Sequence, residues 1–432
     1  MADQFDVVVV GAGLAGTTAA IACARRGLQV ALLERGQYPG SKNVQGGILY
    51  RHPLDTILPK FWDEAPLERQ IIEQRVWITT KDGLVSAGHR HEAANDPPNA
   101  WSVLRAKFDR WYAKKAEEAG VVLANQTTAH DLLWDGPSVA GVKTADSSEG
   151  DLPAKITILA EGVTSILAEK AGLRRANLSM DRLALAVKEV VTLPASVIED
   201  RFNVRAPFGA TIELLGEFSK GTLGYGFIYT NTDSLSIGFG AVLADLVATN
   251  QNPNDLLEEM KAHPAVAPLL EGGELSEYSA HSIPEGGFKE VQHVHGAGVM
   301  VVGDSAALVN VFHREGSNLA IESARLAAET AVEAIERKDT SAEALAAYRR
   351  RLWQSFAIRD LEKYKNGPDF FQRNRQFLTL YPRLLNDSAR ELTTVDGASK
   401  REKQGLIIKR LRRERGLLGL AKDLWGAWRA VR

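Results

Sequence analysis

The first thirty-five residues constrain the fold more than any other stretch of the chain. Val7–Val10 is a run of β-branched apolar residues, which is typical of a buried parallel strand. The run breaks at Gly11, and the alanine-rich segment Leu14–Arg26 predicts a helix. A second apolar run, Gln29–Leu33, ends at the acidic Glu34. Strand, helix and strand in this order predict a βαβ unit, and therefore an α/β fold with a parallel sheet.

Three glycines at the first turn of this unit have the spacing G-x-G-x-x-G: Gly11, Gly13 and Gly16. In such a turn the first glycine permits a tight bend, the second lets a pyrophosphate approach the backbone, and the third lets helix and strand pack closely. The N–H groups at the start of the helix would face the phosphates. Glu34 follows Gly16 by eighteen residues, where a carboxylate accepts hydrogen bonds from an adenosine ribose and disfavours a 2′-phosphate. The pattern predicts a dinucleotide site.

The composition limits the class of protein. The 432 residues are enough for two or three domains, and the formal net charge of −2 gives no sign of a nucleic-acid partner. The single cysteine, Cys23, can form neither an internal disulfide nor, alone, a zinc site or an iron–sulfur cluster. The chain begins directly with a core strand, and no apolar run reaches the ~18 residues that cross a bilayer. We therefore expect no signal peptide and a cytoplasmic protein, at most attached to a membrane surface.

Two segments after the βαβ unit each allow two interpretations. Gly40–Tyr50 is a polar connection with close-set glycines, which indicates either backbone pressed against a ligand or a flexible surface loop. Ser102–Glu118 has the spacing of an amphipathic helix. Arg105, near the start of that helix, would either clamp a phosphate or face solvent.

Two later strands also end in a glycine and an acid. Lys155–Leu159 leads into Ala160-Glu161-Gly162, and the apolar run that starts at Gly298 ends at Gly303-Asp304. An aspartate in that position can accept hydrogen bonds from a polyol. The helix predicted over Leu319–Arg337 can present its N-terminus to a group that becomes negative. A nicotinamide dehydrogenase needs no such second site, whereas a cofactor with a ribityl chain and a redox ring does. The two sites together therefore predict FAD.

From about Leu183 to Glu290 the pattern changes to alternating segments, such as Thr222–Tyr229 and Ser234–Val242. These predict an antiparallel sheet in a second domain inserted into the first. The aromatic residues of this region would either line a flat apolar pocket or fill the core of the sheet; they are Phe218, Tyr225, Phe227, Tyr229 and Phe239.

The last segment, residues 400–432, is strongly basic. It carries eleven lysines and arginines against three acids, a local net charge of +8, with leucine and tryptophan interspersed. Such a segment suits a helix on anionic lipid or a docking tail for an acidic partner. It is also compatible with a helix packed on its own domain with a solvated basic face.

With these motifs in view, the whole chain resembles the glutathione-reductase-type flavoproteins of the p-hydroxybenzoate hydroxylase fold. Within them it is similar to the FixC branch of the electron-transfer-flavoprotein:quinone oxidoreductases. The N-terminal glycines, Ala160-Glu161-Gly162 and Gly303-Asp304 are marks of the larger group. Gly40–Gly47 and Leu308–Asn318 are marks of the branch, and the helix with Arg105 and Phe108-Asp109 fits it too.

The resemblance implies that Arg105 reaches the FAD, that Asp304 binds the ribityl chain, and that the loop Gly316–Asn318 lies at the flavin ring. His313, in the same loop, is a candidate for delivering protons to a quinone or else has a structural role. No metal site is predicted. The predicted cofactor-binding residues are Gly11, Gly13, Leu14, Ala15, Gly16, Glu34, Arg35, Lys42, Asn43, Gly46, Gly47, Arg105, Ala160, Glu161, Gly162, Gly303, Asp304, Gly316, Ser317 and Asn318.

The predicted fold is thus α/β, with a Rossmann-like FAD-binding domain of the glutathione-reductase type, an inserted antiparallel β-sheet domain for substrate or quinone, and a helical C-terminal region. The FAD-binding domain is expected to comprise residues 1–75, 101–182 and 291–338. Residues 76–100 are expected to make an excursion into the substrate domain, which is otherwise formed by 183–290. The helical region is expected over 339–432, with the basic amphipathic tail at its end.

The resemblance also implies partners. Mitochondrial-type members carry a cysteine-ligated [4Fe–4S] cluster, which this chain cannot hold, whereas the FixC branch leaves the cluster to a ferredoxin-like subunit, FixX. We therefore expect a complex with FixX-like and FixA/FixB-like electron-transfer flavoprotein subunits, a quinone as acceptor, and no nucleic acid. In that setting electron bifurcation supplies low-potential electrons, for example for nitrogen fixation, at the inner face of the cell membrane.

Three alternatives stay open from the sequence. A geranylgeranyl or other prenyl reductase shares the fold, although the Phe-Pro-Lys-like element of those enzymes is absent after Gly226–Thr230. An FAD-dependent aromatic monooxygenase would react with NAD(P)H and oxygen. A structural subunit would use its basic tail to anchor a complex to the membrane.

Overall fold

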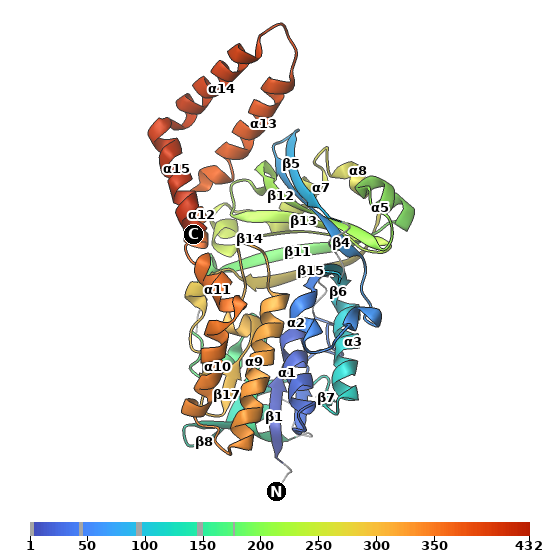
Figure 1. Cartoon of the computed structure of the whole chain (residues 1–432), viewed down its shortest axis with the longest axis vertical. Helices are drawn as coiled ribbons and strands as arrows, with labels where there is room; N and C mark the ends of the chain where they lie inside the picture. Colours follow the sequence, from blue (N-terminus) through green and yellow to red (C-terminus); the bar gives the residue numbers. More distant parts are fainter. Residues whose placement is uncertain (1–3, 43–45, 92–96, 145–149, 176–177) are drawn as a thin grey trace. The chain divides into compact units, whose positions relative to one another are not determined.

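The computed structural model describes residues 4–42, 46–91, 97–144, 150–175 and 178–432 (Figure 1). By its internal contacts the chain forms two compact units, each assembled from three segments. Unit 1 comprises Met1–Glu68, Pro97–Leu183 and Ser282–Lys363, and unit 2 comprises Arg69–Asp96, Ala184–His281 and Tyr364–Arg432. The assignment of six functional parts to the chain stays a prediction.

An eight-stranded sheet forms the centre of unit 1, with the order β16-β17-β10-β1-β2-β7 and with β8 and β9 joined to it through β10. The four pairings β17–β10, β10–β1, β1–β2 and β2–β7 are parallel, so the carboxyl ends of these strands lie at one edge. The strands are β1 (Phe5–Val10), β2 (Val30–Leu33), β7 (Val122–Ala124), β8 (Ala129–Asp135), β9 (Ser138–Thr144), β10 (Asp151–Leu159), β16 (His295–Gly296) and β17 (Val299–Val301). The predicted βαβ unit and the two later strands are confirmed.

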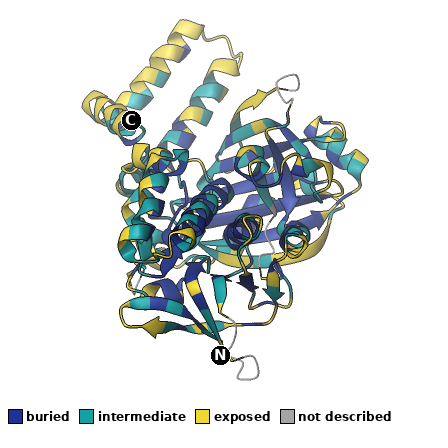
Figure 2. Ribbon diagram, turned by 60° about the horizontal axis from the view of Figure 1, so that its bottom comes forward, coloured by how far each residue is buried: buried dark blue, intermediate teal, exposed yellow. Residues whose placement is uncertain are grey.

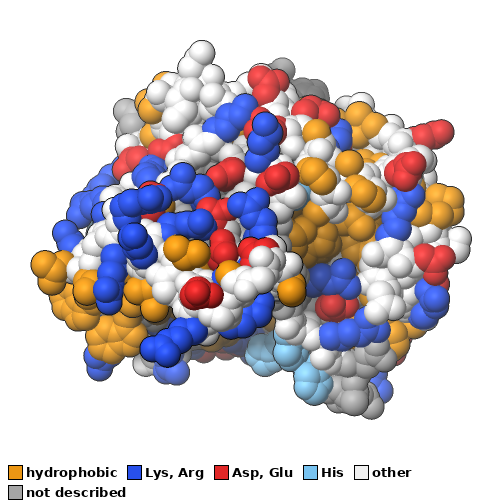
Figure 3. Space-filling model, turned by 90° about the horizontal axis from the view of Figure 1, so that it is seen from above, with side chains coloured by type: hydrophobic (Ala, Val, Ile, Leu, Met, Phe, Trp, Pro, Cys, Tyr) orange, Lys and Arg blue, Asp and Glu red, His pale blue; other side chains and the backbone are white. Residues whose placement is uncertain are grey.

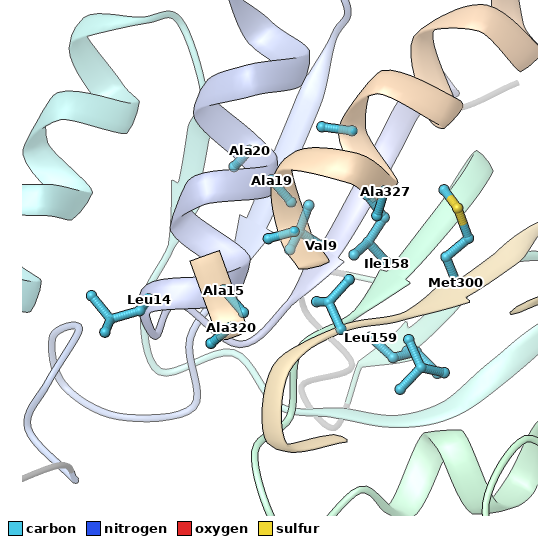
Figure 4. Packing of buried hydrophobic residues seen from close by; sticks show 14 of the residues in the cluster. Val9, Leu14, Ala15, Ala19, Ala20, Ile158, Leu159, Met300, Ala320 and Ala327 are labelled. Atoms are coloured by element: carbon cyan, nitrogen blue, oxygen red, sulfur yellow. The ribbon is translucent and has the colours of Figure 1, made fainter. Parts of the chain in front are cut away.

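Helices α1 and α9 pack together beside this sheet through small side chains (Figure 4). A Cβ on Gly303 would lie 3.1 Å from Ala15 Cβ and 3.4 Å from Ala320 Cβ, so the two helices and the end of β17 meet closely. Alanine at these positions lets the backbones approach and brings the start of each helix to the edge of the sheet. The helices of unit 1 are α1 (Leu14–Ala24), α2 (Arg51–Asp55), α3 (Arg105–Glu118), α4 (Ile166–Lys170), α9 (Ser317–Glu336), α10 (Ala342–Gln354) and α11 (Phe356–Lys363).

Two paired strands occupy part of the predicted connection Gly40–Tyr50 and the first residues of the predicted helix Ser102–Glu118. β3 (Gly46–Tyr50) pairs antiparallel with β6 (Ala100–Leu104), with Ile48 opposite Ser102. The helix expected from Ser102 therefore begins only at Arg105, and the second half of the expected glycine-rich loop is a strand. Both differences have one cause, because each strand is formed by hydrogen bonds to a partner far away in sequence.

Unit 2 contains the strand order β15-β11-β14-β13-β12-β4, with β5 paired to β4. The pairs β11–β14, β14–β13, β13–β12 and β4–β5 are antiparallel, as predicted for this region, whereas β12 and β4 run parallel. The strands are β4 (Gln70–Thr79), β5 (Leu84–Arg90), β11 (Leu183–Thr192), β12 (Phe208–Gly216), β13 (Gly224–Thr230), β14 (Ser234–Val242) and β15 (Glu274–Pro284).

Short helices cover one face of the unit 2 sheet and form its core. Ile198 and Phe202 from α5 and Met260 from α7 pack in one buried cluster with Ile237 and Phe239 from β14. These helices are α5 (Ala195–Phe202), α6 (Leu243–Ala248), α7 (Pro253–Lys261) and α8 (Ala267–Leu270). The chain ends in α12 (Gly367–Arg373), α13 (Leu380–Thr393), α14 (Lys400–Arg415) and α15 (Leu417–Ala430), of which the last two are mostly exposed (Figure 2).

Candidate functional site

The turn between β1 and α1 is one end of the candidate site. Gly11 has φ +100°, and its N–H donates to the Leu33 carbonyl at 2.8 Å, which joins the turn to the end of β2. A Cβ on Gly11 would overlap the Ala160 carbonyl, and a Cβ on Gly16 would overlap the Gly11 carbonyl. The first and third glycines of the motif therefore have the steric roles that the sequence predicts.

Gly13, the second glycine, has a different environment. It is the N-cap of α1 with φ −77°, and a Cβ there would meet no atom within 4 Å. No side chain caps this helix, and no acidic residue lies in its first turn. The N–H groups of the first turn are thus left for an external acceptor, and the helix dipole favours a negative one. The open space at Gly13 and the uncapped helix together fit a pyrophosphate.

Glu34 lies at the end of β2, beside this turn. Its Oε2 accepts the Ala12 N–H at 3.2 Å and its Oε1 accepts the Gly36 N–H at 2.6 Å, so both carboxylate oxygens are held by backbone. A carboxylate has about four acceptor positions, and the remaining ones can receive ribose hydroxyls. The predicted neighbours Arg35 and Lys42 are exposed, and Asn43 lies outside the described residues.

Arg105 begins α3 and is fixed by Asp109 one turn later. Its Nε donates to Asp109 Oδ1 at 2.6 Å and its Nη2 donates to Oδ2 at 2.8 Å. Burial raises the pKa of Asp109, and the guanidinium counteracts part of that rise. Gly40 has φ +90°, and a Cβ there would lie 2.9 Å from the Arg105 carbonyl, so this glycine lets the preceding loop pack on the first turn of α3.

Asp304 follows β17 directly and lies within electrostatic range of two arginines. Burial raises the pKa of its carboxyl, while Arg105 and Arg174 lower it in part. A Cβ on Gly316 would lie 4.0 Å from Asp304 Oδ1, which connects this carboxylate to the start of α9. The next residue, Ser305, donates its hydroxyl to the Gly162 carbonyl at 3.1 Å, so the loops after β10 and β17 are joined.

The side chain of Glu161 is engaged within its own loop. Its two oxygens accept the N–H groups of Leu167 at 2.9 Å and Ala168 at 3.1 Å, at the start of α4. Burial raises the pKa of this carboxyl in spite of these bonds. Any contact of Ala160, Glu161 and Gly162 with a cofactor stays a prediction.

The N-terminus of α9 is the other end of the candidate site. Gly316 is its N-cap, with no capping side chain and no acid in the first turn. Ser317 Oγ donates to the Ile48 carbonyl at 3.3 Å, and Asn318 Nδ2 donates to Glu315 Oε2 at 2.9 Å. Within the described part of the chain Asn318 Oδ1 is buried without a hydrogen-bond partner, and a Cβ on Gly47 in β3 would meet no atom within 4 Å. This end therefore offers polar groups, open backbone and the positive end of a twenty-residue helix.

Two arginines of the site have no predicted role. Arg174 donates to the Val163 carbonyl at 2.9 Å and to Ser165 Oγ, while its buried Nη2 lacks a hydrogen bond within the residues described. Arg314 lies in the loop before α9 with φ +55°. Nothing in the local pattern of the sequence distinguishes Arg174 from a surface arginine. Arg314 belongs to the motif Leu308–Asn318, but only Gly316–Asn318 of this motif are predicted to lie at the flavin.

The structure places His313 at the surface and some of the aromatic residues of unit 2 in its core. His313 is exposed, with its ring 5.5 Å from that of Phe312. Phe218 and Phe239 belong to the core of unit 2, whereas Phe227 stacks on Tyr229 at 4.8 Å outside that cluster. A Cβ on Gly238, opposite Phe227, would overlap the Phe227 ring, so glycine there lets this buried ring pack directly on the backbone of β14.

Taken together, the groups of unit 1 fit an elongated dinucleotide with a redox ring. Its phosphates would lie at α1, its ribityl chain at Asp304, and its ring at α9; when bound, FAD supplies the electron-transfer chemistry. Among the described residues, no group of three or more His, Cys, Asp or Glu could hold a metal. The fold and the site define an FAD-dependent oxidoreductase.

Comparisons with known proteins agree with this class and narrow it. Residues 6–177 match the model of the FAD dependent oxidoreductase family, and residues 367–432 match the ETF-QO/FixC family C-terminal domain. The chain is 46% identical over 433 residues to Protein FixC of Azotobacter vinelandii, covering 100% of both chains. It is also 39% identical over 424 residues to the probable electron transfer flavoprotein-quinone oxidoreductase YdiS of Escherichia coli, covering 98% of this chain and 97% of that protein. The chain belongs to the FixC family.

A solved structure shares the fold. A geranylgeranyl bacteriochlorophyll reductase-like protein from Thermoplasma acidophilum superposes with a TM-score of 0.75, covers 98% of each chain and is 22% identical. At this identity the similarity concerns the fold alone. Together with the family match over residues 6–177, it confirms the predicted class, an FAD-binding α/β protein with sheets and a helical C-terminal region.

Proposed function

We propose that this protein passes electrons from an electron-transfer flavoprotein to a membrane quinone, as the FixC subunit of an electron-bifurcating complex. The observation that carries the proposal is full-length similarity to FixC proteins and to YdiS, together with the family-specific C-terminal domain at residues 367–432. The name of YdiS, a probable electron transfer flavoprotein-quinone oxidoreductase, contains both the donor and the acceptor. Electron transfer between bound cofactors needs no nucleophile, and Cys23, the chain's single cysteine, is buried.

The proposed quinone would be held by apolar, planar surfaces. The ring of half-buried Tyr229, which stacks on the buried Phe227 ring at 4.8 Å, supports such a site, because a planar ring stacks well on an aromatic face. We propose Tyr229→Ala as its test, with Phe218→Leu in the core as the control. The proposal expects the first variant to weaken quinone binding while FAD stays bound.

The first experiment is anaerobic and uses the full, FAD-loaded chain. Reduced electron-transfer flavoprotein is added, the flavin spectrum is followed, and a soluble quinone analogue is then supplied. Flavin reduction followed by reoxidation with quinone is the expected result. A flavin that ignores quinone but reacts quickly with oxygen or with a prenyl lipid would replace the proposal by a monooxygenase or a prenyl reductase. Quinone reduction that persists when the flavin is blocked would favour a structural subunit.

The partner subunits are part of the same proposal. A single-cysteine chain must leave an iron–sulfur cluster to another protein, which supports a FixX-like partner beside FixA/FixB-like flavoprotein subunits. Co-purification from cells that express all four proteins tests this directly. The expected complex contains iron and FAD, and isolation of this chain alone under mild conditions would contradict it.

We further propose that the C-terminal helices attach the protein to the inner face of the membrane. Several large apolar side chains of α14 and α15 are exposed, and Figure 3, seen from the side of α13–α15, shows them among lysines and arginines. The exposed apolar residues are Leu406, Ile408, Leu417, Leu418, Leu424, Trp425 and Trp428. Arg429 and Arg432 lie over the Trp425 and Trp428 rings, 4.7 Å from each centroid. Tryptophan beside arginine suits the headgroup region of a bilayer.

No helix of the described chain is long and apolar enough to span a bilayer. Deletion of residues 400–432 should abolish flotation with vesicles that contain anionic lipid, while FAD stays bound. A second variant, Trp425→Ser with Trp428→Ser, tests the apolar contact without removing charge. Retention of vesicle binding by both variants would contradict the membrane proposal.

A further inference from the structure

A half-buried arginine lies just before the helix whose N-terminus forms the flavin end of the candidate site. Arg314 adopts φ +55° in the loop between β17 and α9, three residues before the helix begins at Ser317. Burial lowers the pKa of its guanidinium to about 10, which still leaves it charged at neutral pH. This charge is partly removed from water, so its field is screened less than in bulk solvent.

The loop that carries Arg314 is fixed by backbone and side-chain bonds. The N–H of Asn310 donates to the Glu315 carbonyl at 2.8 Å, and the N–H of Glu315 donates back to the Asn310 carbonyl at 3.1 Å. Glu315 Oε2 accepts from Asn318 Nδ2, which fixes this carboxylate at the first turn of α9. The position of Arg314 between these anchored residues is thus set by the fold.

Tyr50, at the end of β3, faces the same cluster. Burial raises the pKa of its hydroxyl to about 12, Glu315 raises it further, and Arg314 lowers it. The electrostatic influence of both residues places the phenol near Arg314 and Glu315. β3 is itself joined to α9 by the bond from Ser317 to Ile48, so three elements converge on this cluster.

We propose that Arg314 is a positioning residue that sets the electron affinity of the flavin, by adding a fixed positive charge to the dipole at the N-terminus of α9. A charge near a flavin ring tunes its electronics, and a cation favours the reduced, more negative ring. The anchored loop holds Arg314 two residues before Gly316, the N-cap of α9, so its backbone lies at the positive end of the helix. The inference concerns the FAD itself and holds whatever protein donates the electrons and whatever molecule accepts them.

The test measures the bound cofactor without any partner or quinone. Arg314→Met removes the charge, and Arg314→Lys keeps it. The midpoint potential of the flavin is measured by spectroelectrochemistry, and the affinity for sulfite, which adds to electron-poor flavins, is measured by absorbance titration. We expect Arg314→Met to lower the potential and to weaken sulfite binding by about tenfold or more, the effect of losing one nearby charge at intermediate dielectric. The sulfite affinity of Arg314→Lys should stay within about threefold of that of the unmodified protein.

Lys338→Met is the matched control, because Lys338 is exposed at the other end of α9 and has the same φ of +55°. It should leave both readouts unchanged. Unchanged potential and sulfite affinity in Arg314→Met, with FAD retained, would overturn the proposal. Equal losses in the methionine and lysine variants would also overturn it, because charge would then not be the cause. If Arg314→Met does not retain FAD, Arg314→Gln takes its place with the same expected outcome.

Discussion

Arg105 and Asp109 lie one helical turn apart on α3 and form a two-point ion pair, with distances of 2.6 and 2.8 Å between their nitrogens and oxygens. Asp109 is only 2% exposed, whereas Arg105 is less deeply buried. The pair thus has one end in the core and the other near Asp304, whose pKa Arg105 helps to lower. The helix geometry itself, with side chains four residues apart on one face, holds the guanidinium ready for a ligand.

We expect Asp109→Leu to release Arg105 and to weaken both folding and FAD binding. Removal of one partner of a buried pair costs about 3 kcal/mol of the free energy of unfolding. The dissociation constant of FAD should rise by about tenfold, because the guanidinium loses its fixed orientation. Denaturant unfolding and flavin fluorescence titration measure the two effects. Glu117→Gln, at an exposed position of the same helix, is the control. Tight FAD binding in the leucine variant would show that Arg105 needs no support from Asp109.

Gly13 and Gly16 provide a second, contrasting prediction. Gly13→Ala should fold normally, because φ is −77° and the new methyl group meets no protein atom within 4 Å. The methyl group would instead occupy space needed by the pyrophosphate, so FAD affinity should fall by at least about tenfold. Gly16→Ala should fail at folding, because its Cβ would overlap the Gly11 carbonyl. Thermal unfolding of the apoproteins and FAD titration separate the two effects. A Gly13→Ala protein with undiminished FAD binding would contradict this assignment of the phosphate position.

The contrast between these glycines also shows how much the sequence could predict. Local spacing was sufficient for the β1–α1–β2 unit, because a tight turn, a helix and two apolar strands leave their own pattern over thirty residues. The same holds for β13 and β14, whose bounds lie within two residues of the predicted segments, although β14 is buried along its whole length. Gly46–Tyr50 has no such signal, since it becomes a strand only through pairing with β6, about fifty residues later.

The arginines of the site show the same limit. The role of Arg105 at the cofactor is predicted from its place near the start of a helix and from the family resemblance. Its bond to Asp109 follows from helical spacing alone. Arg174 follows the short helix α4, and only the folded chain brings it within range of Asp304. Tyr50 and Arg314 are separated by more than 260 residues, and their proximity depends on β3 lying beside α9. Electrostatic partners of this kind are set by tertiary contacts, which a single sequence does not report.

The middle of α15 is held by a buried carboxylate, Asp423. Asp423 accepts two bonds from Arg415, at 2.6 and 2.8 Å, and further bonds from Tyr381 at 2.6 Å and Gln376 at 3.0 Å. The Arg415 hydrogen bonds are the main cause that lowers the pKa of Asp423 to about 2. Asp423→Asn should loosen α15 from α13 and increase the rate of chymotrypsin cleavage at the C-terminal tryptophans by about tenfold. FAD content should not change.

Lys409→Gln is the control for this variant, because Lys409 is exposed on α14. Limited proteolysis followed by mass measurement of the fragments gives the cleavage rates. Equal rates in the asparagine variant and the unmodified protein would show that apolar contacts, rather than this network, hold α15.

Glu285 gives a prediction on pH. Burial raises the pKa of its carboxyl from an ordinary value of 4.5 to about 8. Its N–H donates to the Arg182 carbonyl at 2.7 Å, which fixes the backbone at the end of β15. Between these two pKa values the folded protein binds more protons at this residue than the unfolded chain does. The free energy of unfolding should therefore fall as the pH rises from about 4.5 to about 8, by at most ~1.4 kcal/mol per pH unit for this one group.

Glu285→Gln removes the titrating proton while it keeps the size of the side chain. Denaturant unfolding of the two proteins at a series of pH values between 5 and 9 is the measurement, and the glutamine variant should lose less stability between pH 5 and about 8. Glu277→Gln, at an exposed position of β15, should behave like the unmodified protein. Parallel stability curves for the unmodified and Glu285→Gln proteins would mean that Glu285 is ionised in the folded state at neutral pH, with water or a nearby cation solvating its charge.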